Sequence, residues 1–185
     1  VVMSNICDIS NVQAEMMFVG CLYKKPELIL EVENVIKSEV YFCDTVSKFF
    51  YESALILYSK NQSFSENTIT VFMTQDEDRL STFKRFGGLE TIRSFMEYAT
   101  LEDFQAYYEE IKKYSLVREY TEKGFDTSKI RNTKKFVTAT ANDVYYWVRQ
   151  MVDRVHTSVL SETETEYISN EMGSFANSFL EQPDM

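Results

Sequence analysis

Apolar residues recur at intervals of three and four along most of this chain, which is the spacing of one face of an α-helix. In the first hundred residues the pattern breaks into short stretches separated by a few polar residues, glycines or a proline. The predicted helices cover residues 12–24, 26–36, 45–58, 65–73, 80–86 and 89–98. The third of them carries the most aromatic residues, so we expect it to form the centre of the core.

Polar residues at the helix starts predict where the helices begin. Ser10 and Gln13 resemble a capping box for the first helix, and Asp44 or Thr45 is predicted to cap the third. In the first helix Val12, Met16, Val19 and Tyr23 recur at helical spacing. Glycine supplies the backbone freedom of a helix stop, so Gly87-Gly88 is predicted to end the fifth.

Two longer helices are predicted in the next sixty residues. The first runs from Phe104 to about residue 124 behind a capping pair, Thr100 and Asp103. The second begins after the capping pair Thr140 and Asp143. Residues 124–140 between them show no period and are rich in Thr, Ser and Lys, so they are predicted to form a loop or hairpin tip.

The two long helices are predicted to pair antiparallel as a hairpin. Their aromatic residues exceed what two helices can bury against each other, which favours a contact between subunits or with a partner. Packing against the first domain is the alternative. The residues assigned to the hairpin and oligomer interface are Tyr107, Ile111, Tyr114, Trp147, Val148 and Met151.

An acidic, polar stretch follows at residues 161–166, and a narrow apolar seam then indicates a short docking helix made by Ile168, Met172, Phe175 and Phe179. We therefore predict an all-α protein: a compact multi-helix domain over residues 1–99, a long helical hairpin over 100–160, and an acidic linker with a C-terminal linker helix over 161–185. With only 5 Gly and 2 Pro and 44% hydrophobic residues, the composition agrees with helices throughout.

The net charge of −10 predicts little direct nucleic-acid binding, because phosphate backbones are bound chiefly by clustered cations. The charge is uneven, however: residues 1–100 carry −5, residues 101–160 carry +1 and residues 161–185 carry −6. Around the predicted hairpin tip the only acidic residue is Asp126, whereas five residues are basic: Lys123, Lys129, Arg131, Lys134 and Lys135. A solvated loop and a contact with nucleic acid or an acidic protein both fit this pattern.

The three cysteines are odd in number, lack CxxC spacing and lie in apolar surroundings, which favours a reducing, cytoplasmic compartment. No apolar run is long enough to span a membrane, and residues 1–10 do not look like a signal peptide. We expect a soluble protein without membrane contact.

The sequence offers no catalytic, cofactor-binding or metal site. It lacks the glycine-rich loops that bind nucleoside phosphates, and His156, the only histidine, has no ligand or nucleophile at helical spacing. Asp76-Glu77-Asp78 fits a helix start better than a cation site. Glu109-Glu110 fits a solvated face paired with Lys112 and Lys113 better than a catalytic pair.

The order of these elements resembles the N-terminal domain of the DnaB-type bacterial or phage replicative helicases. The resemblance covers about residues 11–122 in residue pattern and 140–160 in layout. It rests on Gln13-Ala-Glu15, Gly20-Cys-Leu22, Pro26-Glu-Leu28, Phe50-Tyr-Glu52, Leu57-Tyr58, Gly87-Gly88, Ala106-Tyr107 to Ile111, and Arg118-Glu119. The basic, Thr-rich segment 124–140 departs from the usual family sequence.

The resemblance implies a noncatalytic assembly and primase-recruitment domain of a hexameric helicase in the primosome. It implies self-association into a ring, contact with a DnaG-type primase and with a helicase loader, and a separate motor domain that binds ATP and Mg²⁺. The docking helix would then lie on a neighbouring subunit's motor. Primase contact maps to Phe125, Ile130, Phe136 and Val144.

Two other functions remain open. A free-standing helical adaptor could capture primase or a loader, and the reading frame beyond residue 185 distinguishes it from a helicase fragment. The second open function is a module that binds nucleic acid through the basic residues of the tip.

Overall fold

The computed structural model describes residues 8–32 and 36–159, and within these ranges it contains helices and no strand. The predicted all-α class is confirmed. The chain divides into two units between Val144 and Tyr145, which are described separately below. Hairpin pairing of the two long helices concerns both units and stays a prediction, as do the domain boundaries. The docking residues Ile168, Met172, Phe175 and Phe179 lie outside the described residues.

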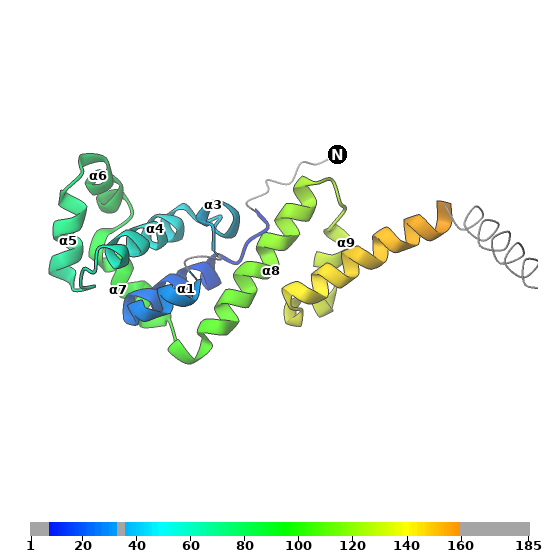
Figure 1. Cartoon of the computed structure of the whole chain (residues 1–185), viewed down its shortest axis with the longest axis horizontal. Helices are drawn as coiled ribbons and strands as arrows, with labels where there is room; N and C mark the ends of the chain where they lie inside the picture. Colours follow the sequence, from blue (N-terminus) through cyan, green and yellow to red (C-terminus); the bar gives the residue numbers. More distant parts are fainter. Residues whose placement is uncertain (1–7, 33–35, 160–185) are drawn as a thin grey trace, which may run out of the picture. The chain divides into compact units, whose positions relative to one another are not determined.

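The first unit is a succession of short helices followed by one long one (Figure 1). Its elements are α1 (Val12–Lys24), η2 (Pro26–Leu28), α2 (Ile29–Val32), α3 (Ser38–Tyr41), α4 (Thr45–Ser59), α5 (Glu66–Thr74), α6 (Glu77–Arg85), α7 (Gly88–Tyr98), η3 (Leu101–Asp103), α8 (Phe104–Glu122), α9 (Ser128–Arg131) and η4 (Lys134–Thr138), where η marks a 3-10 helix. A further helix covers residues 141–159.

The core is centred on α1 and α4, as the aromatic content of α4 predicts. Phe18 of α1 stacks on Phe104 with ring centroids 5.1 Å apart, and Phe42 lies 4.8 Å from Tyr51. Each aromatic side chain removes a large apolar area from water, so this cluster supplies much of the hydrophobic stabilisation. The residues without any exposed area include Phe18, Val19, Leu22, Phe50, Tyr51, Ala54 and Leu57.

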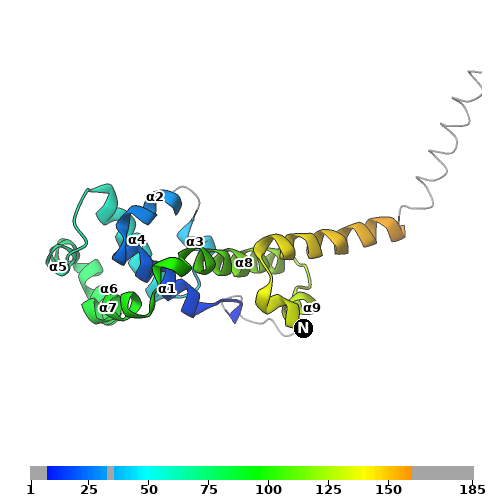
Figure 2. The same ribbon diagram turned by 90° about the horizontal axis from the view of Figure 1, so that it is seen from below.

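Helices α1 and α7 lie side by side (Figure 2) and cross at Gly20. A Cβ atom on Gly20 would lie 2.1 Å from the carbonyl oxygen of Phe95 and 2.9 Å from the Cβ of Ala99. These distances leave no room for a side chain. The close approach of the two backbones therefore depends on glycine at this position.

Most predicted helix starts are confirmed because capping is a local interaction. Asp44, Ser65 and Asp76 each accept a hydrogen bond from the backbone N–H three residues on. Gly87 and Gly88 have positive φ angles of 88° and 61°, as a helix break requires.

Several details of the predicted helices are wrong. The predicted helix over residues 26–36 is a 3-10 turn at Pro26–Leu28 followed by α2 at Ile29–Val32, and Ile36 lies outside a helix. The cap of α1 is Asn11 rather than Ser10, since the Asn11 side chain accepts from the N–H of Ala14 at 3.1 Å. In α1 the side chain of Val12 is 42% exposed, whereas Phe18 and Leu22 lie in the core. Thr100 and Asp103 make no side-chain cap, because the 3-10 turn η3 precedes α8.

The predicted loop over residues 124–140 contains two short helical turns, α9 and η4. Each turn buries one apolar side chain, Ile130 on α9 and Phe136 on η4. Helices of four and five residues show no repeat of apolar positions, which is why the sequence pattern predicts a loop.

We expect the Gly20→Ala substitution to destabilise the protein by about 2 kcal/mol or more, because the new methyl group meets a backbone carbonyl that cannot move aside. Urea unfolding followed by circular dichroism measures the change. Gly124→Ala is the matched control: Gly124 has a φ of +89° but no atom within 4 Å of a Cβ, so only the backbone cost of about 1 kcal/mol is expected. Equal losses in the two variants would contradict the tight crossing.

Candidate partner-binding surfaces

The buried guanidinium of Arg118 fixes α8 to the rest of the first unit. Its Nη1 donates to the carbonyl oxygen of Ile9 at 2.8 Å, and its Nη2 donates to those of Val40 at 2.8 Å and Tyr41 at 3.0 Å. The last two carbonyls lie at the C-terminal end of α3, where the helix dipole favours a cation. Hydrogen bonds to charged groups are stronger than neutral ones, so the position of α8 along its axis is well determined.

Glu15 is a buried carboxyl beside this contact. Its oxygens accept hydrogen bonds from the N–H groups of Cys43 at 3.2 Å and Asp44 at 2.9 Å, just before α4 begins. Burial raises the pKa of Glu15, although these N–H groups and the charge of Arg118 act in the opposite direction. Glu15 therefore ties α1 to the start of α4 at an electrostatic cost.

Lys113 connects α8 to the segment that follows it. Only 1% of its surface is exposed, and its Nζ donates to Glu110 Oε1 at 2.6 Å and to the carbonyl oxygen of Phe136 at 3.2 Å. The same Nζ lies 4.8 Å from the centroid of the Phe136 ring. The predicted ion pairs with Glu109 and Glu110 are present, but Lys113 is not on a solvated face.

Residues 124–140 form a two-sided segment. On the inner side Thr127, Ile130 and Phe136 are buried. Thr127 Oγ1 lies 2.7 Å from Thr121 Oγ1 on α8, and the Phe136 ring meets Tyr114 edge-on at 5.5 Å. The outer side exposes the lysines Lys129, Lys134 and Lys135. The segment is thus packed onto α8 while its cations face water.

The residues assigned to primase contact do not form one exposed surface. Ile130, Phe136 and Val144 are buried, whereas Phe125 is half-buried with its ring 5.6 Å from that of Tyr120. A partner at this segment would meet Phe125 and exposed neighbours such as Val137, which is 76% exposed. The assignment itself stays a prediction.

The residues assigned to the oligomer interface are partly accessible. Within the first unit Ile111 is buried, while Tyr107 and Tyr114 are half-buried. Within the second unit Val148 is buried, while Trp147 and Met151 are half-buried. Their role in self-association also stays a prediction.

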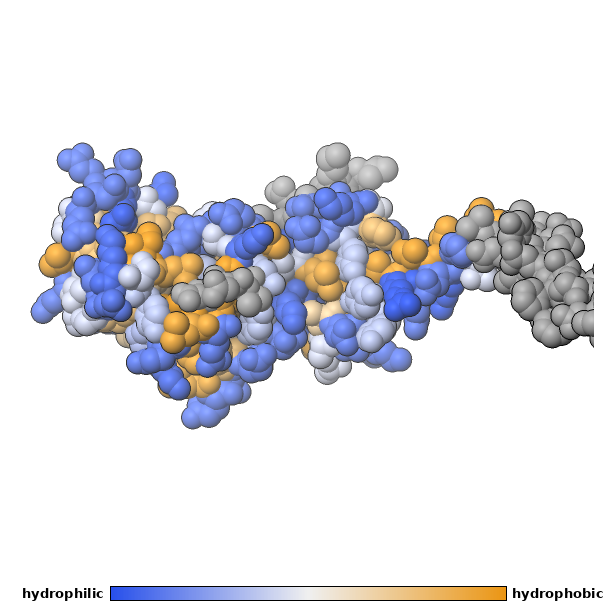
Figure 3. Space-filling model, in the orientation of Figure 1, coloured by the Kyte–Doolittle hydropathy of each residue, from blue (hydrophilic) through white to orange (hydrophobic). Residues whose placement is uncertain are grey.

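The helix of residues 141–159 begins with the predicted capping box. Asp143 Oδ2 accepts from the N–H of Thr140 at 2.8 Å, and Thr140 Oγ1 accepts from the N–H of Asp143 at 3.2 Å. Farther along, in the second unit, apolar side chains lie along one side of the helix (Figure 3). The exposed members of this stripe are Val152 at 46%, Val155 at 64% and Val159 at 71%. Valines exposed at spacings of three and four form a narrow seam for another helix.

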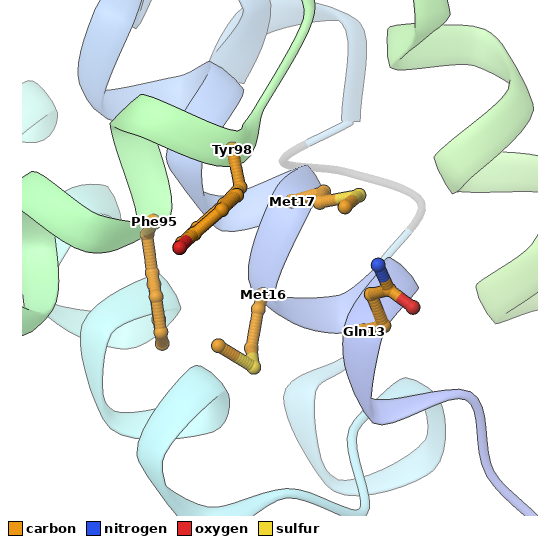
Figure 4. Close-up of a pocket in the computed structure, with 5 residues that line it drawn as sticks. All are labelled: Gln13, Met16, Met17, Phe95 and Tyr98. Carbon is orange, nitrogen blue, oxygen red and sulfur yellow. The ribbon is translucent and has the colours of Figure 1, made fainter.

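An apolar pocket of about 230 Å³ lies between α1 and α7 (Figure 4). Its walls are Gln13, Met16 and Met17 from α1, and Phe95 and Tyr98 from α7. Unbranched methionine side chains adapt to irregular shapes, so the pocket could accept an apolar side chain.

The described residues meet neither the requirements of a metal site nor those of a membrane span. Among them, no group of three or more His, Cys, Asp and Glu side chains could hold a metal ion. His156 is exposed on the helix of residues 141–159, and Cys21 is a buried free thiol. No described helix combines the length and apolarity that crossing a membrane requires.

Three comparisons place the chain among known proteins. The sequence model of the DnaB-like helicase N-terminal domain matches residues 8–113. The SPbeta prophage-derived uncharacterized protein YorI of Bacillus subtilis (strain 168) is 26% identical over 122 residues, which cover 64% of this chain and 24% of YorI. The chain therefore spans about a quarter of the length of this curated relative.

The crystal structure of the N-terminal domain of DnaB helicase from Mycobacterium tuberculosis is similar at a TM-score of 0.54, over 78% of this chain and 97% of that one. The identity is 19%, so this likeness concerns the fold.

We expect Glu15→Gln to become more stable relative to the wild type as the pH rises above about 4.5. The native state holds the Glu15 proton more tightly than the unfolded state does, so ionisation above that pH costs native stability. Glutamine cannot ionise, and its oxygen can still accept the two hydrogen bonds. Urea unfolding between pH 4 and pH 8 (roughly the range in which folded proteins are most stable) measures the difference, with Glu31→Gln as an exposed control. A difference that falls with rising pH would contradict the inferred direction.

Proposed function

Because the chain belongs to the DnaB-like helicase N-terminal domain family, we propose that it is the noncatalytic assembly and primase-recruitment domain of a hexameric replicative DNA helicase. The observation that carries the proposal is the family match over residues 8–113, more than half of the 185 residues. The fold shared with the mycobacterial domain supports it.

In this proposal the region works by binding alone. ATP and Mg²⁺ would bind to a separate motor domain, which would unwind the DNA. The aligned region occupies 24% of YorI, which leaves space in that protein for further domains. The region described here would then hold the helicase subunits together and bring a primase to the replication fork.

Assembly would use the exposed valines of the second unit. Val152, Val155 and Val159 expose apolar surface in a stripe on one helix, and burying such surface stabilises association by about 25 cal/mol per Å². A neighbouring copy that contributes the same stripe would complete a two-helix seam. We propose this stripe as the centre of the contact between subunits, with the half-buried Trp147 and Met151 beside it.

Primase recruitment would use the accessible apolar residues of the 124–140 segment. Val137 is the most exposed of these, and Phe125 offers part of its ring. Because Lys113 holds the backbone at Phe136 and Val137, these side chains are presented from an ordered support. A DnaG-type primase would therefore bind with little loss of chain entropy on this side.

We expect Val155→Glu to weaken self-association of the chain at least about tenfold, because a carboxylate would be buried against apolar surface. Light scattering across a concentration series measures the assembly. Gln150→Glu adds the same charge at an exposed, polar position of the same helix and should leave assembly unchanged. A wild-type chain that stays monomeric at every concentration would sink the assembly proposal.

We expect Val137→Ser to weaken binding of a DnaG-type primase about fivefold or more, the loss typical of an apolar contact residue. Isothermal titration calorimetry with the purified primase measures the dissociation constant. Thr138→Ser is the control on the same turn, and circular dichroism confirms that both variants fold. Unchanged affinity in Val137→Ser, or no binding by the wild type, would contradict recruitment through this surface.

A further inference from the structure

Residues 127–142 carry positive charges and no negative one. Between Asp126 and Asp143 the sequence contains Lys129, Arg131, Lys134 and Lys135 and no carboxylate. The three lysines are exposed and Arg131 is half-buried. None of the four forms an ion pair with a carboxylate of the described residues. Because the three lysines are exposed, a ligand can reach their charges from the solvent.

Asp126, the acid that precedes this stretch, is already engaged in local hydrogen bonds. Asp126 Oδ1 accepts hydrogen bonds from both the N–H and the hydroxyl of Ser128. These bonds lower the pKa of Asp126, and the positive charges of Lys129 and Arg131 lower it further. Residues 127–142 thus carry four cations and no carboxylate, although the chain as a whole is acidic.

The segment that carries the cations is held in place by buried side chains. Ile130 and Phe136 anchor the two turns underneath, and Lys113 holds the carbonyl oxygen of Phe136. A ligand would not have to order a flexible loop, so less of the binding free energy would be lost to entropy. Exposed Asn132 and Thr133 lie between the cations. Amide and hydroxyl groups beside Lys and Arg are the usual donors to phosphate oxygens.

We propose that this segment binds the phosphodiester backbone of single-stranded nucleic acid. The helical turns that carry the cations have only four and five residues, too short to lie in a major groove and read base pairs. The surface therefore fits a backbone-tracking contact without sequence preference. This function goes beyond assembly and primase recruitment and does not depend on either.

The net charge of −10 limits the affinity without excluding the contact. At about 0.1 M salt the Debye length is about 10 Å, so acidic groups farther away are largely screened. The expectation of little nucleic-acid binding then holds for the rest of the surface, and this segment is the exception. Four cations that each neutralise one phosphate give a slope of log K against log salt of about −3.

Fluorescence anisotropy of the whole chain with labelled oligothymidine and oligouridine of about 20 nucleotides tests the proposal. We expect binding that weakens with salt at about this slope. The triple variant Lys129→Glu, Lys134→Glu, Lys135→Glu should lose at least about tenfold in affinity. A matched control, Lys25→Glu, Lys37→Glu, Lys84→Glu, changes the net charge equally at exposed lysines elsewhere and should lose much less.

Each outcome of the binding experiment either supports or overturns the proposal. Loss in the first variant alone supports it, and the ratio between the two oligonucleotides shows whether DNA or RNA is the better ligand. No binding at about 50 mM salt, or equal loss in both triple variants, overturns it. Binding of an acidic peptide of residues 161–185 without binding of either oligonucleotide also overturns it, in favour of a protein ligand. Light scattering of the same samples reports on assembly, so the two proposals fail separately.

Discussion

The hydrogen bonds from the buried Arg118 guanidinium to three backbone carbonyls are the constraint on which the first unit depends. A buried charge is tolerated only where its donors are satisfied, so these bonds permit essentially one position of α8. Once α8 is placed, Lys113 reaches the carbonyl of Phe136 and positions the segment after it. These contacts hold in place the segment that carries the exposed lysines.

The interior of the protein is tightly packed, whereas the residues available for binding are exposed. The aromatic cluster around Phe18 and the tight crossing at Gly20 leave little freedom inside. Apolar side chains remain exposed on the helix of residues 141–159 and cations on the 124–140 segment. The helix exposes apolar area and the 124–140 segment exposes positive charge, so the two suit different ligands. Membership of the DnaB-like family accords with a region that functions through contacts.

Much of the fold could be predicted because its signals are local. The caps Asp44 and Ser65, the break at Gly87-Gly88 and the capping box of Thr140 and Asp143 each involve residues within four positions of one another. The family could also be recognised, since the quoted motifs fall mostly in the matched residues 8–113. The prediction was weakest at the candidate site, where the 124–140 segment has neither periodicity nor the usual family sequence.

The sequence by itself determined the longer helices, most of their caps, the family and the local excess of cations, because each follows from residue type and short-range spacing. Only the tertiary structure decided which polar residues are interior and which apolar ones are not. Lys113 and Arg118 are buried because carbonyls from distant segments meet them. Phe136 is buried where Tyr114 of α8 packs against it, and Ile130 is buried on the same segment, while Lys129, Lys134 and Lys135 stay exposed. Such contacts join residues far apart in the chain, and no local pattern records them.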